Sequence, residues 1–458
     1  MIEVYRWRQL DRWDAFTIPH LHIAPHLPQT TIGELLSPRH ERVDRSQWSF
    51  EQLQPITIHF GGDISRRKMA TGTNYTMPLF WVKPGDVVLS KIDLKNGAVG
   101  VLPEGWDNAV VTSHFKVYEP DLERLDPRYF RLLLQTQDFK KWLWANRSGA
   151  DGRTEVKLDV FEALAIPLPP VAQQKSLCDA YTLSLARAEQ LEQEAAAIER
   201  AGWQAFETAL GVAPSLPLPD RPVFVARFKD VERWSHESIL RQSVSGSKQQ
   251  HSWPLTRLGD LVADLENGWS PKCHNHPARE GKWGVLKLGA VSFGTFNANE
   301  NKELPATLKP RPEYEVMTGD VLISRANVVR YVGACAYVDS TSPHLLLCDK
   351  IFRVRFRSDS QLLPRFLAEA MKLNSVREHI ESRLTGTSPT MKNISKPALL
   401  DIRFPLPDTE TQQHLVDGVA SSRESAITKR TEAAALRRTA WTMFEAALFT
   451  TTEGLPHK

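Results

Sequence analysis

Residues 166–210 read IPLPPVAQQKSLCDAYTLSLARAEQLEQEAAAIERAGWQAFETAL, a run of prolines followed by an uninterrupted helical pattern. Residues 404–448 repeat this design as FPLPDTETQQHLVDGVASSRESAITKRTEAAALRRTAWTMFEAAL. Matching residues keep a constant separation of 238 positions (404 − 166, 441 − 203, 448 − 210). This register predicts two copies of one long helix, each preceded by prolines.

Small and apolar residues recur along both helices in alternating steps of four and three, which is the pattern of a coiled-coil seam. Each helix is therefore predicted to pack against the other; the alternative is two unrelated amphipathic helices, each packed on its own domain. Lys429 interrupts the second seam, so either packing is looser there or the lysine stem extends outward. The predicted seam consists of Leu177, Tyr181, Ser184, Ala188, Leu191, Ala195, Ile198, Gly202, Ala205 and Ala209 in the first helix, and of Leu415, Val419, Ser422, Ala426, Lys429, Ala433, Leu436, Ala440, Met443 and Ala447 in the second.

Two aromatic residues lie near the end of each helix at matching positions, Trp203 and Phe206 in the first and Trp441 and Phe444 in the second. They are candidate anchors for a partner subunit, or they pack beneath the adjoining globular domain. Because the chain repeats itself, docking at these positions predicts two copies of the same partner.

The chain of 458 residues is too long for one hydrophobic core and predicts two to four domains. Its 41% hydrophobic and 24% charged residues are typical of a globular protein in water. No apolar run approaches the roughly 20 residues that span a bilayer, and the N-terminus lacks the apolar segment of a signal peptide, so we expect a cytoplasmic protein without a membrane partner. The net charge of +3 does not indicate a nucleic-acid binder by itself, so any DNA contact must come from local basic patches.

Residues that usually hold metals or carry catalysis form no strong motif. The four cysteines include no CxxC pair, and the histidine-rich segments 20–26 and 273–276 lack the paired arrangement of a zinc site, so no metal site is predicted. The sequence has no Walker A loop, no GxGxxG, no GxSxG and no Asn/Asp-Pro-Pro-Tyr/Phe motif, which predicts neither catalytic residues nor a cofactor bound by this chain.

One nuclease-like set is present, with Asp121, Glu155 and Lys157 as carboxylates and a lysine able in principle to hold a metal and polarise a phosphate. The corresponding place in the second half, Thr390-Met391-Lys392, has no carboxylate. Coincidence is the favoured interpretation, and a nuclease remains an alternative.

The segments in front of the two helices also repeat one plan. In the first, short strand-like runs separated by Gly and Pro turns precede a helix from Tyr129 to Trp144. Gly319–Arg325 corresponds to Gly85–Lys91, and Ile351–Val354 is matched with His114–Val117. The predicted fold is α+β, with two globular domains alternating with two long helices that pair as an antiparallel coiled coil in an internal pseudo-twofold repeat.

The predicted domains are 1–165 (first globular domain), 166–211 (first spacer helix), 212–250 (linker), 251–405 (second globular domain), 406–450 (second spacer helix) and 451–458 (tail). An antiparallel pair would put the globular domains at opposite ends of a rod of roughly 60 Å, at 1.5 Å per helical residue. Two spaced domains suit a target with two separated sites, such as a DNA duplex read at two major-groove patches.

Several segments carry a family resemblance: WPLTRLGDLV at 253–262, NGWSPK at 267–272, WGVLKLGAV at 283–291 and GDVLISRANVVRYVG at 319–333. Together with IPLPP and FPLP before glutamine-containing helices, they make the chain resemble the specificity subunit of type I restriction-modification systems (HsdS-like) over nearly its full length.

The resemblance implies two target recognition domains that read the two halves of a split DNA sequence, with the helices as spacer. It also implies a subunit without catalysis of its own, which docks two methyltransferase subunits, with S-adenosylmethionine on the methyltransferase, and is completed by restriction subunits. The alternatives are a duplicated coiled-coil scaffold that does not read DNA, and a recognition subunit of a methylation-only or related phage-defence complex.

The candidates for DNA contact are basic or amide side chains in turn-rich segments. Arginine pairs with guanine and asparagine with adenine in the major groove, whereas lysine more often neutralises phosphate. Any one of these side chains is otherwise a solvated surface charge. The candidates are Arg66, Arg67, Lys68, Lys91 and Lys95 in the first domain, and Lys272, Lys287, Arg325, Asn327, Arg330 and Lys392 in the second.

Overall fold

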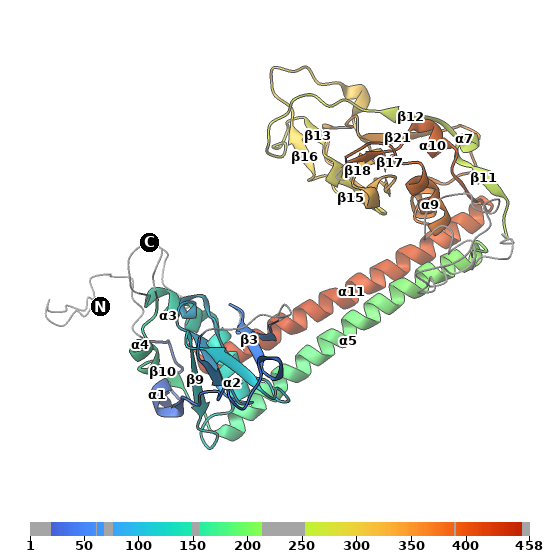
Figure 1. The fold of residues 1–458 in the computed structure, drawn as a ribbon. Coiled ribbons are helices and arrows are strands. Elements are labelled where there is room, and N and C mark those ends of the chain that lie inside the picture. Colours follow the sequence, from blue (N-terminus) through green and yellow to red (C-terminus); the bar gives the residue numbers. More distant parts are fainter. Residues whose placement is uncertain are drawn as a thin grey trace. The chain divides into compact units, whose positions relative to one another are not determined.

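The computed structural model describes residues 20–60, 62–67, 77–147, 155–212, 252–388 and 391–450, and the chain divides into two compact units. Unit 1 combines the segment up to Glu192 with the segment from Arg430, and unit 2 is Gln193–Lys429. The long helices α5 (Val171–Ala209) and α11 (Thr409–Leu448) each run through both units (Figure 1). Each unit therefore contains one globular head and one end of each long helix.

Head 1 comprises the described residues from His20 to Leu168, and head 2 those from Ser252 to Leu406. The strands of head 1 are β1 (Gln29–Thr31), β2 (Leu36–Arg39), β3 (Gln54–Ile58), β4 (Ile64–Arg66), β5 (Leu79–Trp81), β6 (Val87–Ser90), β7 (Val99–Val101), β8 (Ala109–Thr112), β9 (Phe115–Pro120) and β10 (Ala165–Pro167). Its helices are α1 (Ile32–Leu35), α2 (Pro127–Gln135), α3 (Gln137–Ala145) and α4 (Leu158–Glu162), with 3-10 turns η2 (Phe50–Gln52) and η3 (Leu94–Asn96).

The strands of head 2 are β11 (Leu255–Arg257), β12 (Val262–Asn267), β13 (Gly284–Leu286), β14 (Val291–Ser292), β15 (Thr295–Phe296), β16 (Asn301–Glu303), β17 (Val321–Ser324), β18 (Ala326–Asn327), β19 (Cys335–Tyr337), β20 (Leu345–Leu346), β21 (Ile351–Phe356), β22 (Lys392–Asn393) and β23 (Arg403–Pro405). Its helices are α7 (Leu258–Leu261), α8 (Pro364–Ala370), α9 (Asn374–Ser382) and α10 (Lys396–Leu400), with 3-10 turns η5 (Leu288–Ala290), η6 (Pro312–Tyr314) and η7 (Val329–Tyr331).

Each head is built on a four-stranded antiparallel sheet with one strand order. The order is β2-β9-β6-β7 in head 1 and β12-β21-β17-β19 in head 2. The central strands β6 and β17 are buried along their whole length, because alternate residues enter two different hydrophobic clusters, one on each face of the sheet. The α+β fold with an internal repeat is confirmed.

Each head also contains a smaller sheet that includes one parallel strand pair. Head 1 has the order β4-β3-β8-β5 with β3 and β8 parallel, and head 2 has β16-β13-β20 with β13 and β20 parallel. The pairs β1–β10 and β11–β23 join the first strand of each head to the strand just before its long helix. Head 2 has two further short ladders, β14–β15 and β18–β22.

The repeated Gly-Asp dipeptide builds the same turn in both heads. Gly85 and Gly319 have φ of 86° and 97°, a left-handed conformation that other residues rarely adopt. The next residue closes the turn: the Asp86 carboxylate accepts a hydrogen bond from the Lys83 amide at 2.8 Å, and that of Asp320 accepts one from the Met317 amide at 2.9 Å. Both turns lead directly into the buried central strand.

One correspondence inferred from sequence is out of register. Ser90 pairs with Phe115 across β6–β9, and Ser324 pairs with Ile351 across β17–β21. Phe115 therefore corresponds to Ile351, so the match of His114 with Ile351 was wrong by one residue. The similar triplets Phe-Lys-Val and Phe-Arg-Val suggested that match, but a slip of one residue moves every side chain to the other face of the sheet.

Within unit 1 the beginning of α5 pairs antiparallel with the end of α11. Ala188, Leu191 and Ala433 are buried in one cluster. Nearer the head, the Tyr181 ring lies edge-on to Trp441 with centroids 5.8 Å apart. The unit 1 core continues through Cys178, Phe444, Leu448 and Phe449 into head 1.

Within unit 2 the end of α5 pairs antiparallel with the beginning of α11. Ala195 and Ala426 are fully buried, and Gly202 meets Ser422 so closely that a Cβ at Gly202 would lie 2.3 Å from the Ser422 hydroxyl oxygen. Lys429 is 30% exposed and forms an ion pair with Glu194. The antiparallel pairing is thus present in each unit, and the close approach of small residues explains the Ala- and Gly-rich sequence.

The seam departs from the predicted heptad near the helix ends. Ala205, Ala209 and Met443 are exposed, Met443 by 67%, whereas their neighbours Phe206, Leu210, Phe444 and Leu448 are buried. A straight helix drifts by about 20° per heptad from a strict 3.5-residue repeat, so the buried stripe moves by one residue. The large side chains on the displaced stripe then pack into the heads. The other named seam residues, Leu177 and Ile198 (half-buried), Leu415 and Val419 (buried) and Leu436 (half-buried), lie on the covered faces.

The described ends of the chain meet in unit 1. The Ala24 amide donates to the Leu448 carbonyl at 2.9 Å, and the Thr450 amide donates to the His22 carbonyl, also at 2.9 Å. The predicted linker beyond Val212 and the tail 451–458 lie outside the described residues.

Candidate nucleic-acid interface

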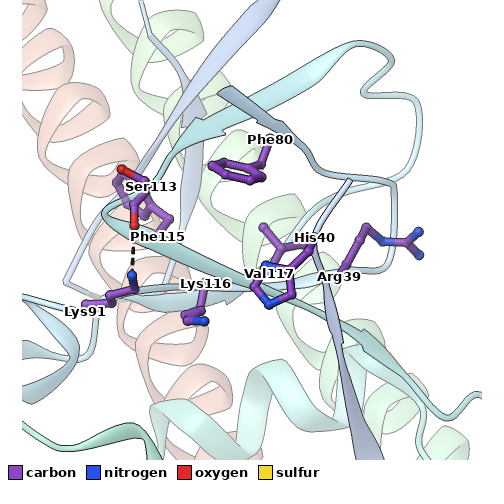
Figure 2. Close-up of a pocket in the computed structure, with 8 residues that line it drawn as sticks. All are labelled: Arg39, His40, Phe80, Lys91, Ser113, Phe115, Lys116 and Val117. Atoms are coloured by element: carbon purple, nitrogen blue, oxygen red, sulfur yellow. Dashed lines mark hydrogen bonds between the residues drawn. The ribbon is translucent and has the colours of Figure 1, made fainter. Parts of the chain in front are cut away.

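A basic pocket of about 130 Å³ opens on head 1, where β2, β5 and the start of β9 meet (Figure 2). Its lining contains no carboxylate. Lys91 lies beside Ser113, and its ammonium donates a hydrogen bond to the Ser113 carbonyl at 2.9 Å. The lining residues are Arg39, His40, Phe80, Lys91, Ser113, Phe115, Lys116 and Val117.

The two basic residues that follow the Gly-Asp strands make the same contact. Lys91 donates to the carbonyl of Ser113, and Arg325 donates to that of Asp349 at 3.4 Å. These carbonyls occupy equivalent positions, two residues before the partners of Ser90 and Ser324. The repeat therefore positions one cation at the same edge of each main sheet, and in head 2 the Arg325 guanidinium also lies 5.6 Å from the Phe352 ring centroid.

Head 2 has a larger basic groove, of about 870 Å³, between the segment after β12 and strand β13. The predicted candidates Lys272 and Lys287 both line this groove. Lys302 and Lys350 line it as well. Lys287 is held by an ion pair with Glu300 at 2.9 Å. The full lining is Ser270, Pro271, Lys272, Cys273, Asn275, Val285, Leu286, Lys287, Leu288, Gly289, Glu300, Lys302, Cys348, Asp349 and Lys350.

The thiols in this groove are neutral near pH 7. Burial raises the pKa of Cys348 to about 11, and burial also raises the pKa of Cys273. Neither is poised as a thiolate ligand or nucleophile. Among the described residues, no three His, Cys, Asp or Glu side chains are grouped to hold a metal ion.

Arg325 connects the groove to the short ladder β18–β22, where two further candidates face each other. Asn327 pairs with Lys392 across this ladder. The Asn327 side chain accepts from the Val328 amide at 2.8 Å, and the Lys392 ammonium donates to the Gly386 carbonyl at 2.6 Å. Arg330 follows in η7, exposed, with its guanidinium 5.6 Å from the Tyr331 ring.

The remaining head 1 candidates are not part of the pocket lining. Arg66 ends β4, exposed, and its guanidinium lies 5.0 Å from the Trp106 ring centroid. Arg67 is exposed just after this strand, and Lys95 lies in η3. Lys68 lies outside the described residues.

The aromatic pairs near the helix ends are turned towards the heads. Phe206 and Phe444 are 1% and 2% exposed and belong to the cores of their units. Trp203 stacks on Phe206 with centroids 5.1 Å apart, and Trp441 stacks on Phe444 at 6.0 Å. Packing beneath the head accounts for both phenylalanines, and only the half-buried tryptophans offer surface to a partner.

Two of the nuclease-like residues, Asp121 and Lys157, have local structural positions. The Asp121 carboxylate accepts a hydrogen bond from the Glu123 amide at 3.1 Å, and Lys157 is the residue before α4. Both stand in the turns that lead into head 1 helices.

Residues that the sequence reasoning missed are Arg39, His40 and Lys116 in head 1 and Lys302 and Lys350 in head 2. They join the predicted candidates only through strand pairing, for example Arg39 opposite Val117 across β2–β9. The available signal was the alternation of polar and apolar residues in Phe115-Lys116-Val117.

Comparison with known proteins shows what the chain is similar to. No family model matches the chain. The chain is 24% identical over 457 residues to the EcoEI specificity subunit, a type I restriction enzyme subunit of Escherichia coli, covering 85% of this chain and 76% of that protein. In sequence the chain is thus similar to a type I specificity subunit. A second relative of this chain is the EcoKI specificity subunit of Escherichia coli K12, 23% identical over 57% of this chain and 51% of that protein.

A solved structure supports the fold of this chain. A chain from a study of complex assembly and conformational transition in the type I R-M system matches over 93% of this chain and 98% of its own length, with a TM-score of 0.56 and 18% identity. Among the described residues, no helix is long and apolar enough to cross a membrane.

Proposed function

We propose that this chain is the DNA sequence-specificity subunit of a type I restriction-modification complex. One observation carries the proposal: two heads with the same strand order occupy two units that share two long helices. Each head presents basic side chains at the same edge of its main sheet. The relatives named as type I specificity subunits support the same function.

In this function each head is a target recognition domain for one half of a split DNA sequence. Head 1 uses the Lys91 pocket, and head 2 uses the Lys272–Lys287 groove with the adjoining Arg325–Asn327 segment. Lysines neutralise phosphates, and Arg325 and Asn327 are of the residue types that pair with guanine and adenine edges. Arg66, Arg67, Lys95, Arg330 and Lys392 supply flanking contacts.

The chain has no catalytic role of its own, and chemistry belongs to its partners. Two methyltransferase subunits, with S-adenosylmethionine bound to them, dock on the repeated helices, and restriction subunits join through them. Trp203 and Trp441 are the docking candidates, because they retain exposed surface. The substrate is genomic DNA, which places the complex in the cytoplasm.

Methylation mapping tests the proposal. Genomic DNA is sequenced for modified bases from cells that express the partner methyltransferase with and without this chain. A split, two-part motif that is methylated only when the chain is present supports the proposed function. If the methyltransferase is active but no new motif appears, the chain is a scaffold without DNA readout.

A further inference from the structure

The head 1 pocket differs from other basic surfaces in the charges around it. Arg39 is neutralised, because its guanidinium contacts Asp86 at 2.8 Å and Glu119 at 3.0 Å. Within the described part of the chain, Lys91 has one hydrogen bond, to a carbonyl oxygen, and no carboxylate partner. Among the residues that the structure describes, Lys116 and His40 have no ion-pair partner.

Uncompensated cations close together repel each other and favour an anion between them. Two half-buried lysines, Lys91 and Lys116, line the pocket together with the exposed His40 (Figure 2). The pocket volume of about 130 Å³ is well below the roughly 300 Å³ at which sites for whole small molecules begin. This space accommodates one phosphate group and is far too small for a whole nucleotide.

The corresponding place in head 2 is built differently. Strand registers equate Lys116, opposite Leu89, with Phe352, opposite Ile323. They also equate Arg39, opposite Val117, with Glu266, opposite Arg353. Among the described residues, the place of Lys116 is thus taken by an aromatic ring and the place of Arg39 by a carboxylate, so this pocket is not repeated at the equivalent position of head 2.

We propose that the Lys91–His40–Lys116 pocket of head 1 holds one phosphodiester group of the DNA backbone and so fixes the position of head 1 on its half-site. This inference rests on the proposed function, and it assigns the pocket to positioning and not to base recognition. A phosphate contact acts equally on every DNA sequence, and it contributes to the salt dependence of binding.

Salt-dependent DNA binding by the full chain, purified with its methyltransferase partner, tests the inference. Lys116→Met keeps the apolar stem and removes the charge, Lys91→Met is the second pocket variant, and Lys116→Arg restores a cation. Lys141→Met is the matched control, because Lys141 is an exposed lysine of head 1 on α3, outside the pocket. Each protein is titrated with duplexes that carry the target or a scrambled first half-site.

We expect Lys116→Met and Lys91→Met each to reduce the magnitude of the slope of log K against log [salt] by about 0.9, the value for one phosphate contact. The affinity for the two duplexes should fall by the same factor in the pocket variants. Lys116→Arg should restore the slope, and Lys141→Met should leave it unchanged. Inorganic phosphate, added at constant ionic strength, competes far less well than DNA.

Two results overturn the assignment while leaving the proposed function intact: an unchanged slope in both pocket variants, or a loss of affinity confined to the target half-site, which would indicate base readout. Saturable binding of inorganic phosphate that Lys116→Met abolishes, with DNA binding unaltered, assigns the pocket to a free anion instead. Absence of any sequence preference in the unaltered protein refutes the proposed function and the pocket assignment together.

Discussion

At the scale of single residues, each half of the molecule has an equivalent buried glutamine whose side chain makes three hydrogen bonds to backbone groups. The Gln174 side chain is fully buried near the start of α5; it accepts from the Asp126 amide and donates to the Arg124 and Pro169 carbonyls, all at 2.8 Å. Gln412 repeats this on α11 with Leu363, Gln361 and Pro407 at 2.8–2.9 Å. In each unit one amide thus ties the long helix to the loop before the first large helix of the head.

Replacing this glutamine therefore leaves three backbone groups without partners. Each buried polar group that loses its hydrogen bond costs about 1–3 kcal/mol, so we expect Gln174→Ala to destabilise unit 1 by about 3 kcal/mol or more. The neighbouring Gln173 is exposed, and Gln173→Ala should change stability by less than about 0.5 kcal/mol. Denaturant unfolding of both variants measures the difference; equal effects would mean that the buried amide is not a structural tie.

A second residue-scale feature is the arginine that pairs with the aspartate of the Gly-Asp turn, which comes from a different strand in each head. The buried Asp86 takes its cation from Arg39 on β2, whereas Asp320 takes it from Arg353 on β21 at 3.3 Å. Arg353 is only 3% exposed and also contacts Glu266 at 2.9 Å. The position of the positive charge is retained although the strand that supplies it differs.

Removing the buried arginine should be far more damaging than removing an exposed one beside it. Arg353→Met leaves Asp320 without its cation and removes one of the two cations that contact Glu266, and we expect a loss of about 3 kcal/mol or more. Arg355 contacts the same Glu266 at 2.8 Å but is 49% exposed, so Arg355→Met should cost less than about 1 kcal/mol. The two melting temperatures, measured side by side, test this; a similar shift in both would contradict the role of burial.

At the scale of elements, each head is joined to its helices by specific contacts. In unit 2 the Glu369 carboxylate on α8 accepts hydrogen bonds from both terminal nitrogens of the Arg423 guanidinium on α11. It also forms an ion pair with Lys372 at 2.8 Å. Burial acts to raise the pKa of Glu369, but the hydrogen bonds from Arg423 and the nearby Lys372 charge outweigh burial, so its pKa lies below the ordinary value. The link between head 2 and its helix therefore depends on an ionised carboxylate.

A lowered pKa in the folded state stabilises the protein above the unfolded pKa of about 4.3, and this contribution is lost as the pH falls through the lower folded value. We expect unit 2 to lose stability progressively below about pH 4. Glu369→Gln should lower stability at pH 7 and flatten the acid limb of the stability curve, whereas Glu424→Gln, an exposed position on α11, should leave the curve unchanged. Thermal melts from pH 7 to pH 3 measure this, and an acid limb of the same steepness in Glu369→Gln would exclude the carboxylate as its source.

Much of the element pattern could be predicted from the sequence. The 238-residue register located both long helices within a few residues of their ends, because apolar spacing and the Pro-rich starts are local signals. Met443 was misplaced because the seam drifts where the heads begin, which depends on tertiary packing. Lys91 was chosen as a candidate because it follows the repeated Gly-Asp dipeptide. Lys116 and Arg39 become its neighbours only through the pairing of β9 with β6 and β2.

At the scale of the whole molecule, the proposed function makes the paired helices a ruler between half-sites. Deleting one heptad from each, residues 189–195 of α5 and the residues 430–436 that pair near them on α11, keeps the seam in register. Each deletion removes about 10 Å of helix, which corresponds to about three base pairs. We expect the gap in the methylated motif to shorten by that amount with both half-sites unchanged.

The control deletes the heptad from α5 alone, which breaks the pairing register and should abolish the motif. An unchanged gap in the double deletion would contradict the ruler. Methylation mapping reads all three outcomes in one assay.

The shared helices also impose an order on biosynthesis. The core of unit 1 contains Phe444, Leu448 and Phe449, and residues 22–24 hydrogen-bond to 448–450. Head 1 leaves the ribosome first, yet it lacks these partners until almost the entire chain has been made. At 5–20 residues per second the delay is roughly 15–55 s. During that interval the nascent head exposes apolar surface to chaperones and proteases, and a premature stop near the C-terminus would disable the N-terminal domain rather than the one beside the break.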